Sequence, residues 1–241
     1  MEKTSVFAEK EDVSKNGMHR RKFLGILGGS ASVVAVAAAC NNDDDDNGTP
    51  YDGAVIGADG TVDLGRGDVG ILNYAYALEQ LEAAFYTKVV TDSASVFSAD
   101  ELSLLTDIRD HEIAHREFLK AALGSKGVPD LAVDFSAVTF SDRNSVLTTA
   151  KTFEDLGVSA YNGAGKLIVS ADYLLLAGKI VSVEARHAAY IRDLISNGSF
   201  ADATAVDAAS GLDAINDPMT VLAAADPFIT TKISAANLPT S

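Results

Sequence analysis

Two short motifs of the form Glu-x-x-His constrain this chain more than any other feature. The first is Glu112-Ile-Ala-His115, and the second, Glu184-Ala-Arg-His187, follows 72 residues later. On a helix, residues three positions apart share a face, so each motif places a carboxylate beside an imidazole. Each motif therefore predicts a helix that presents a metal-binding pair toward the interior of a helical bundle.

A second pair of patterns precedes these motifs. Glu79 lies seven residues before Tyr86, and Glu154 lies seven residues before Tyr161. The two Glu–Tyr pairs are 75 residues apart, close to the spacing of the two Glu-x-x-His motifs. The chain therefore has the pattern of a diverged duplication, in which each half carries Glu, then Tyr, then Glu-x-x-His.

Helical hydrophobic periodicity runs through the segments that carry these residues. We expect helices over about residues 68–90, 98–123, 142–168 and 170–196, with a short one near 218–225. Asp68 and Ser170 are placed to cap the first and fourth helices, and Ser98 begins a capping box with Glu101. The connections are short, long and short. This order predicts an all-α four-helix bundle with one long crossover between the second and third helices.

The four motif glutamates would repel one another if an apolar bundle buried them without compensation. With a rise of about 1.5 Å per residue, the glutamates of each hairpin lie at similar heights. Two divalent cations would balance four carboxylates, and iron or manganese suits a carboxylate-rich site better than copper or zinc. We therefore expect two iron or manganese ions on six residues: Glu79, Glu112, His115, Glu154, Glu184 and His187.

Other polar residues near the motifs leave alternatives open. Glu82 lies one turn from Glu79 and is either the ligand in its place or a solvated partner of Lys88. Only Glu79 matches the Glu–Tyr spacing of the third helix, so we favour it. His111 precedes the first motif's histidine by one turn and is expected to support a ligand or to lie at the surface. Two charged neighbours are expected to face solvent: Asp110 and Glu117.

The stretches NYAYALEQLEAAFY, EDLGVSAYNGAGKLI and VEARHAAYIRDL resemble the ferritin-like superfamily of di-iron and di-manganese carboxylate proteins. Within it, they are most similar to a desiccation-related branch of bacteria and plants. The resemblance spans about residues 68–229 and implies a ferritin-like bundle in which Glu112 and Glu184 bridge two ions. It also implies that Glu79 and Glu154 are terminal ligands and that each ion takes one histidine, His115 or His187. The two tyrosines implied to lie beside the site are Tyr86 and Tyr161.

The N-terminal segment has a different character, reading MHRRKFLGILGGSASVVAVAAAC over residues 18–40. Arg20 and Arg21, a short apolar stretch and Cys40 resemble a twin-arginine export signal joined to a lipoprotein cleavage site. We expect export, followed by lipidation of Cys40 that anchors the protein in the cell envelope. The alternative is a membrane-spanning anchor, for which this glycine-broken stretch is short.

These observations suggest four regions along the chain. We expect a signal peptide at 1–39, an acidic linker with an irregular lead-in at 40–66, the helical domain at 67–229 and a tail at 230–241. The net charge of −15 argues against a nucleic-acid partner, because such proteins need a basic surface. Cys40 is the single cysteine, which excludes a disulfide framework and a rubredoxin-like iron centre.

Two classes of function follow from this reading. In the first, the protein is an exported oxidoreductase that uses O2 or peroxide as a small-molecule substrate, with ferroxidase, peroxidase or catalase-like activity. In the second, it is a non-enzymatic envelope protein linked to stress or desiccation, in which metal is structural or absent. The sequence does not predict an oligomeric state.

Overall fold

Four long helices make up most of the computed structural model, which describes residues 51–240. They are α3 (Gly67–Asp92), α4 (Ala99–Leu123), α5 (Arg143–Gly165) and α6 (Ala171–Ile195). The all-α prediction is confirmed. The predicted export signal with Arg20 and Arg21, the lipidation site Cys40 and the acidic part of the linker lie outside the described residues.

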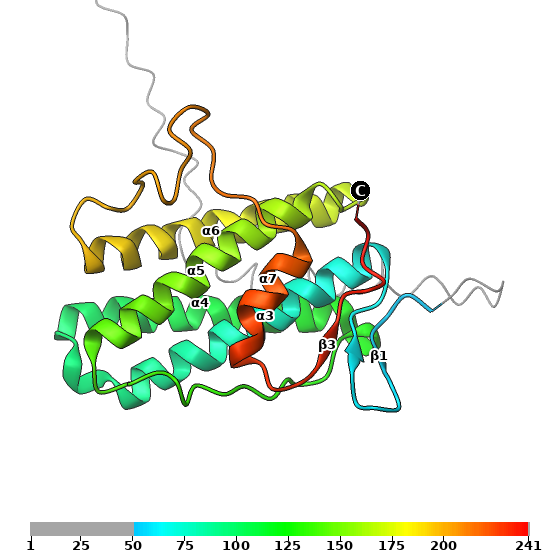
Figure 1. Cartoon of the computed structure of the whole chain (residues 1–241), viewed down its shortest axis with the longest axis horizontal. Coiled ribbons are helices and arrows are strands. Elements are labelled where there is room, and N and C mark those ends of the chain that lie inside the picture. Colours follow the sequence, from blue (N-terminus) through cyan, green and yellow to red (C-terminus); the bar gives the residue numbers. More distant parts are fainter. Residues whose placement is uncertain (1–50, 241) are drawn as a thin grey trace, which may run out of the picture.

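The long helices form two antiparallel hairpins stacked on each other. α3 packs mainly against α4, and α5 mainly against α6, as Figure 1 shows. Short turns close each hairpin; the first contains the 3-10 helix η2 (Ala94–Val96). A long crossover beginning with η3 (Gly124–Lys126) runs along the bundle to reach α5. The arrangement is a four-helix bundle with one long crossover, as the connection lengths predicted.

Local capping residues set most of the helix ends. The predicted capping box is present: the Ser98 hydroxyl accepts from the Glu101 N–H, and the Glu101 carboxylate accepts from the Ser98 N–H. Ser170 caps α6 as predicted. The prediction for Asp68 is wrong, because α3 begins at Gly67 and Asp68 falls within its first turn. Its carboxylate instead accepts the backbone N–H groups of Val169 and Ser170, each at 2.7 Å.

The segments on either side of the bundle come together in a small sheet. β1 (Val55–Ile56) and β2 (Val62–Asp63) form an antiparallel hairpin, and β3 (Ile233–Ser234) pairs parallel with β2. The lead-in at 51–66, predicted to be irregular, therefore contains two short strands, and the tail pairs with the second of them. Strands of two residues have no measurable alternation of apolar and polar side chains, so the sequence pattern did not reveal them.

The short helix α7 (Pro218–Ala225) forms where it was expected and packs on α5. Asp217 caps it, and Pro218 occupies its first turn, where a missing N–H is harmless. The backbone before α7 touches α5 closely: a Cβ on Gly163 would lie 1.8 Å from the carbonyl oxygen of Asn216. Only glycine at this position allows the chain to pass across α5.

An aromatic cluster connects α3 with the crossover and the C-terminal segment. The Phe85 ring on α3 lies 5.0 Å from that of Phe153 on α5 and 5.7 Å from that of Phe135 in the crossover. Phe228 of η4 (Asp226–Phe228) packs edge-on against Phe153 at 4.8 Å. The crossover and the C-terminal segment therefore cover α3, which is buried on nearly all sides along its middle turns.

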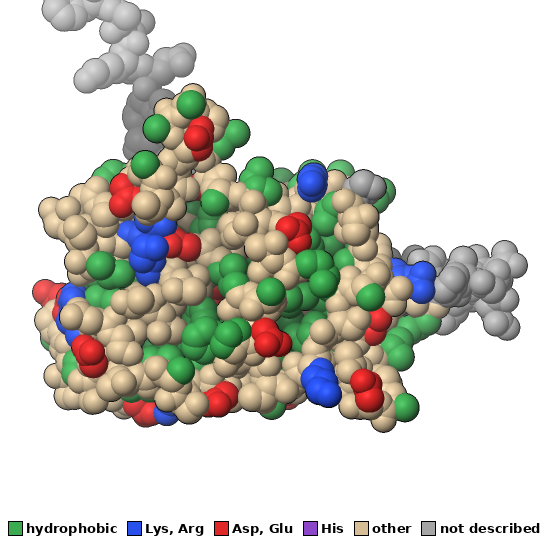
Figure 2. Space-filling view, in the orientation of Figure 1, with side chains coloured by type: hydrophobic (Ala, Val, Ile, Leu, Met, Phe, Trp, Pro, Cys, Tyr) green, Lys and Arg blue, Asp and Glu red, His purple; other side chains and the backbone are tan. Residues whose placement is uncertain are grey.

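Figure 2 shows acidic, basic and apolar side chains mixed over one face of the molecule, with no histidine visible there. None of the helices in residues 51–240 is long and apolar enough to cross a membrane.

Candidate metal centre

The four motif glutamates lie inside the bundle, one on each long helix. Glu79 on α3, Glu112 on α4, Glu154 on α5 and Glu184 on α6 are all 0% exposed. An isolated ionised carboxylate in such a position is very unfavourable, because water no longer solvates it. Their burial in one place therefore requires positive charge nearby or protons on some of the carboxylates.

Two histidines supply donor atoms to this cluster from opposite sides. His115 directs its Nδ1 toward three carboxylates, at 2.9 Å from Glu184 Oε1, 3.5 Å from Glu79 Oε2 and 3.9 Å from Glu112 Oε2. One donor atom from each of these four residues lies within 4.8 Å of the others. This is the first of two sets of donors compact enough to hold a metal ion.

The second set is built in the same way around His187. Its Nδ1 lies 2.8 Å from Glu112 Oε1, 3.5 Å from Glu154 Oε2 and 4.0 Å from Glu184 Oε2. These four donors also lie within 4.8 Å of one another. Glu112 and Glu184 belong to both sets, and each directs one carboxylate oxygen toward each histidine. The structure thus brings together all six residues that the sequence singled out as ligands.

The donor atoms lack ordinary hydrogen bonds. Within residues 51–240, both oxygens of Glu112, Glu154 and Glu184 have no hydrogen-bond partner, and neither does Nδ1 of either cluster histidine. Buried polar atoms in proteins are nearly always hydrogen-bonded, so a convergent group of exceptions needs an explanation. Two cations would satisfy these atoms together, because carboxylate oxygens and imidazole nitrogens are the ligands that iron and manganese accept. The residues present fit a dinuclear metal site.

Burial and crowding change the proton affinities of the carboxyl groups. Burial raises the pKa of Glu79 to about 7. Burial, together with the charges of neighbouring glutamates, raises the pKa of Glu184 well above its ordinary value. Glu112 is buried too, but its contacts with His115 and His187 prevail and lower its pKa to about 2. Glu112 is therefore the carboxylate most firmly held in its charged form.

The histidines respond in the opposite sense to ordinary buried imidazoles. Burial disfavours their charged forms, yet contacts with Glu112 and the other carboxylates raise the pKa of His115 to about 12. Contacts with Glu112 and Glu154 raise the pKa of His187 to about 10. Without metal, protons on the two imidazoles supply positive charge to the cluster. Metal ions and these protons therefore compete for the same nitrogen atoms.

The two tyrosines occupy corresponding positions in the two halves but differ in their contacts. The Tyr161 hydroxyl donates to Glu79 Oε1 at 2.5 Å. Tyr86 lies beside Glu154, whose charge contributes, after burial, to raising the pKa of Tyr86 well above its usual range. The Tyr86 hydroxyl has no hydrogen-bond partner among the described residues.

This difference predicts unequal effects of removing the two hydroxyls. We expect Tyr161→Phe to lower the free energy of unfolding of the metal-free protein by about 1–2 kcal/mol, because a buried hydrogen bond is lost. The matched change Tyr86→Phe removes a hydroxyl without a partner and should leave stability nearly unchanged. Urea unfolding of both variants measures this, and equal losses would contradict the assigned contacts.

Glu82, which the sequence left as either an alternative ligand to Glu79 or a solvated partner of Lys88, is a fifth buried carboxylate. It is 4% exposed, and burial raises its pKa well above the ordinary value. The alternative that it pairs with Lys88 at the surface is wrong, because Lys88 pairs with Asp92. A Cβ on Gly157 would lie 3.1 Å from Glu82 Oε1 and 3.5 Å from Glu184 Oε2. The missing side chain at Gly157 leaves the space that Glu82 occupies.

A signal for this arrangement exists in the sequence. Gly157 is the residue that the 75-residue offset pairs with Glu82. The two halves therefore differ at this position, where one half supplies a carboxylate and the other supplies room for it. Applying the offset to every residue near the motifs, and not only to the glutamates and tyrosines, would have pointed to Glu82 as an internal side chain.

His111 lies beside the second donor set. Its Nδ1 is 3.0 Å from Nε2 of His187, and the two rings stack with centroids 5.2 Å apart. Nδ1 of His187 faces the carboxylates, so His111 holds the opposite edge of the ring. Such a contact fixes the orientation of an imidazole in a metal site. The solvent-facing residues are as predicted: Asp110 and Glu117 are exposed and pair with Arg109 and Arg116.

Comparison with known proteins agrees with this geometry. A family model described as a ferritin-like domain matches residues 67–197, more than half of the chain. The match begins with α3 and ends just after α6, so it contains every residue of the two donor sets. None of the curated proteins compared with the chain matches it. The chain belongs to the family of proteins with a ferritin-like domain.

Proposed function

We propose that this protein binds two iron or manganese ions within its helical bundle and acts as an oxidoreductase on O2 or peroxide. The observation that carries the proposal is the sharing of Glu112 and Glu184 between two compact donor sets whose atoms lack hydrogen bonds. In this assignment both shared glutamates bridge the ions. Terminal ligands complete the two sites: Glu79 with His115, and Glu154 with His187.

Two such ions, when bound, supply one electron each in passing from the divalent to the trivalent state. Two electrons and two protons convert O2 to hydrogen peroxide, or hydrogen peroxide to two waters. This chemistry includes ferroxidase, peroxidase and catalase-like reactions. The protein's own residues shape the site: the bundle excludes bulk water, and the Tyr161 hydroxyl, whose oxygen lies 2.5 Å from Glu79 Oε1, holds a proton toward that carboxylate.

The location of this activity is a separate proposal. We propose that Arg20 and Arg21 direct export by the twin-arginine route and that lipidated Cys40 anchors the protein in the cell envelope. Support comes from the order of basic, apolar and cysteine residues in the N-terminal segment. We propose placement in the desiccation-related branch on the similarity of the three helical stretches that carry Glu79, Glu154 and Glu184.

The experiment that tests the function measures bound metal and turnover together. The full-length protein is purified without chelator, its iron and manganese are quantified by mass spectrometry, and the loaded protein is assayed with O2 and with peroxide. About two ions per chain and redox turnover would support the proposal. A metal-dependent melting temperature without turnover would assign the metal a structural role. A folded protein that takes up no metal would reject the dinuclear site.

The pKa shifts predict how pH affects stability. Glu79 is raised from 4.5 to about 7, His187 from 6.5 to about 10 and His115 from 6.5 to about 12. Between the ordinary and the raised pKa of each group, the folded metal-free protein binds more protons than the unfolded chain. Its stability therefore falls as pH rises through that interval. Glu112, lowered to about 2, acts oppositely and only in acid. Bound metal replaces those protons, so the loaded protein should not lose stability as pH rises through this range.

We therefore expect the metal-free protein to melt at progressively lower temperature from about pH 5 to about pH 9. The difference in melting temperature between loaded and metal-free protein should grow over the same range, because protons compete less well for the ligands. Calorimetry of both forms across this range measures it. A difference that shrinks with rising pH would show that the shifted groups are not the metal ligands.

A further inference from the structure

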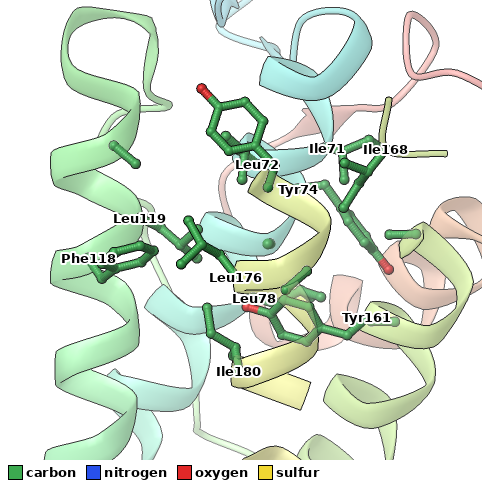
Figure 3. A pocket seen from close by; sticks show the side chains of 16 residues that line it. Ile71, Leu72, Tyr74, Leu78, Phe118, Leu119, Tyr161, Ile168, Leu176 and Ile180 are labelled. Atoms are coloured by element: carbon green, nitrogen blue, oxygen red, sulfur yellow. The ribbon is translucent and has the colours of Figure 1, made fainter. Parts of the chain in front are cut away.

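A cavity lies inside the bundle, beside the cluster of glutamates. Side chains from all four long helices line it, among them Ile71 and Leu78 of α3, Leu119 of α4, Tyr161 of α5 and Ile180 of α6 (Figure 3). Its volume is about 30 Å³. The cavity therefore lies between the four helices, among buried and half-buried side chains, on the side of the cluster toward the start of α3 and α6.

The cavity contacts the candidate metal centre through residues that the two share. Tyr161 lines the cavity and donates its hydroxyl hydrogen bond to Glu79. Leu78 directly precedes Glu79 in the chain, and Ile180 lies about one helical turn before Glu184. A small molecule in this cavity thus lies against Tyr161, whose hydroxyl contacts Glu79.

Size and polarity restrict what the cavity can hold. About 10–15 Å³ is needed for one water-sized molecule, so a space of 30 Å³ accepts a diatomic or similarly small molecule and excludes a lipid or a sugar. Most of the lining side chains are Ala, Leu, Ile and Phe. Of the lining tyrosines, Tyr161 already donates to Glu79, and Tyr74 brings one buried hydroxyl that has no hydrogen-bond partner among the described residues. Water and hydrogen peroxide need several hydrogen bonds when buried, whereas an apolar cavity stays dry and takes up apolar atoms and molecules.

We propose that this cavity binds dioxygen and holds it beside the dinuclear centre. The proposal rests on the proposed function and narrows it, because it assigns O2 and not peroxide as the oxidant that the bundle admits from this side. Dioxygen is apolar, diatomic and uncharged, which matches the volume and the lining. The cavity thus raises the local concentration of dioxygen next to Glu79 before any electron transfer occurs.

The first experiment uses the metal-free, full-length protein and dissolved dioxygen as the probe. Dioxygen is paramagnetic and increases the relaxation rate of methyl groups that it approaches, which methyl NMR under oxygen pressure detects. We expect a several-fold larger increase at the methyls of Leu78 and Ile180 than at those of Leu147 and Ile191. The latter two are buried controls that do not line the cavity, at 1% and 0% exposure against 4% for Leu78 and 7% for Ile180. Equal increases at all four residues would overturn the proposal.

A filled cavity provides the second experiment. Ala177→Leu adds volume at a half-buried position in the lining, and Ala189→Leu makes the same change on α6 away from the cavity. In the iron-loaded protein, we expect Ala177→Leu to slow oxidation by O2 several-fold and to leave oxidation by peroxide unchanged. The Ala189 variant should match the original protein in both. Equal slowing with the two oxidants, or no slowing with O2, would overturn the role of the cavity.

The two experiments separate this proposal from the one on which it rests. The NMR measurement needs no metal, so loss of the relaxation effect counts against the cavity alone. A protein that shows the effect but takes up no iron or manganese counts against the proposed function alone. Should Ala177→Leu fail to fold, the NMR comparison on the original protein still decides whether dioxygen enters.

Discussion

Replacing both Glu112 and Glu184 by glutamine is expected to reduce bound metal from about two ions per chain to nearly none. These residues are the two that both donor sets share, so their loss damages both sites at once. Glutamine keeps the shape of glutamate but supplies a neutral amide in place of a carboxylate. The remaining glutamates and histidines then cannot balance and coordinate two cations.

The same change should abolish stabilisation by metal. A ligand present at about 1,000 times its dissociation constant stabilises a folded protein by about 4 kcal/mol, and we expect this increment in the original protein to vanish in the double variant. Metal analysis and thermal unfolding, with and without added manganese, measure both effects. The control is Glu117→Gln, an exposed glutamate on the same helix as Glu112. A double variant that still binds two ions would disprove the bridging assignment.

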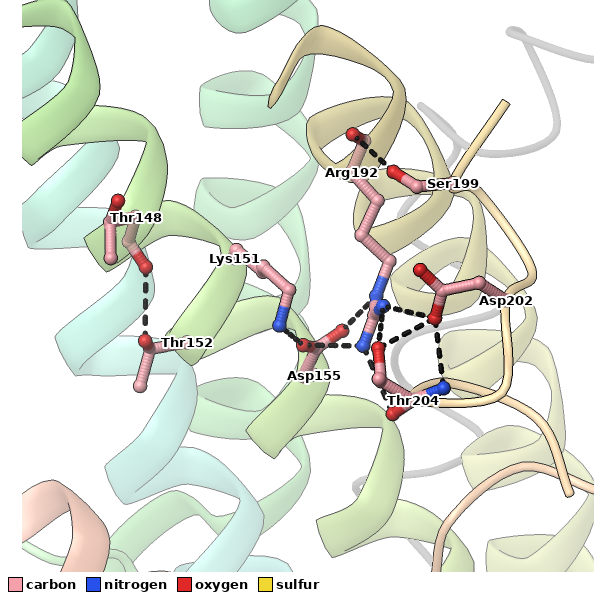
Figure 4. A network of polar contacts seen from close by, with 8 residues as sticks. All are labelled: Thr148, Lys151, Thr152, Asp155, Arg192, Ser199, Asp202 and Thr204. Carbon is pink, nitrogen blue, oxygen red and sulfur yellow. Dashed lines mark hydrogen bonds and ion pairs between the residues drawn. The ribbon is translucent and has the colours of Figure 1, made fainter. Parts of the chain in front are cut away.

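Arg192→Met is expected to lower the free energy of unfolding by about 2–4 kcal/mol. Arg192 on α6 is 3% exposed, and its guanidinium donates two hydrogen bonds to Asp155 on α5, at 2.7 and 2.8 Å (Figure 4). It also donates to the hydroxyl and carbonyl oxygens of Thr204, at 2.8 and 3.2 Å. One side chain therefore fastens the segment after α6 to both helices of the second hairpin.

The magnitude follows from what the substitution leaves behind. Without Arg192, the buried part of Asp155 loses its bidentate partner, although Lys151 remains 2.8 Å away and the side chain is 26% exposed. These two facts place the loss of stability below that of a fully buried broken ion pair.

Urea unfolding measures the loss of stability in Arg192→Met, and limited proteolysis should cut the segment near Thr204 faster in this variant. The control is Arg109→Met, which removes a surface pair and should change stability by less than about 1 kcal/mol. Similar losses in the two variants would contradict the anchoring role.

Several features of this protein could be predicted because they depend on residues close together in the chain. The capping box at Ser98 and the cap at Ser170 are interactions within one helical turn, and they form as predicted. Glu112 with His115, and Glu184 with His187, share helix faces because of helical periodicity alone. The need for charge balance then indicated that such pairs would face one another in a bundle.

Other features depend on contacts between distant segments, and the sequence pattern did not show them. Asp68 binds backbone groups more than 100 residues away, instead of capping its own helix. Glu82 is internal because glycine at position 157 leaves space for it. Burial of this kind depends on the shape of a neighbouring helix, which periodicity within one helix does not describe.

The sequence by itself determined the helices, their order and the spacing of the four glutamates and two histidines that face the core, because these follow from local backbone preference and residue spacing. Only the tertiary structure decided which donors lie together in one compact set, which histidine His111 contacts and where the packing leaves a cavity beside Tyr161. The physical reason is that packing sets the distances between side chains on different helices. Both the donor sets and the cavity depend on those distances.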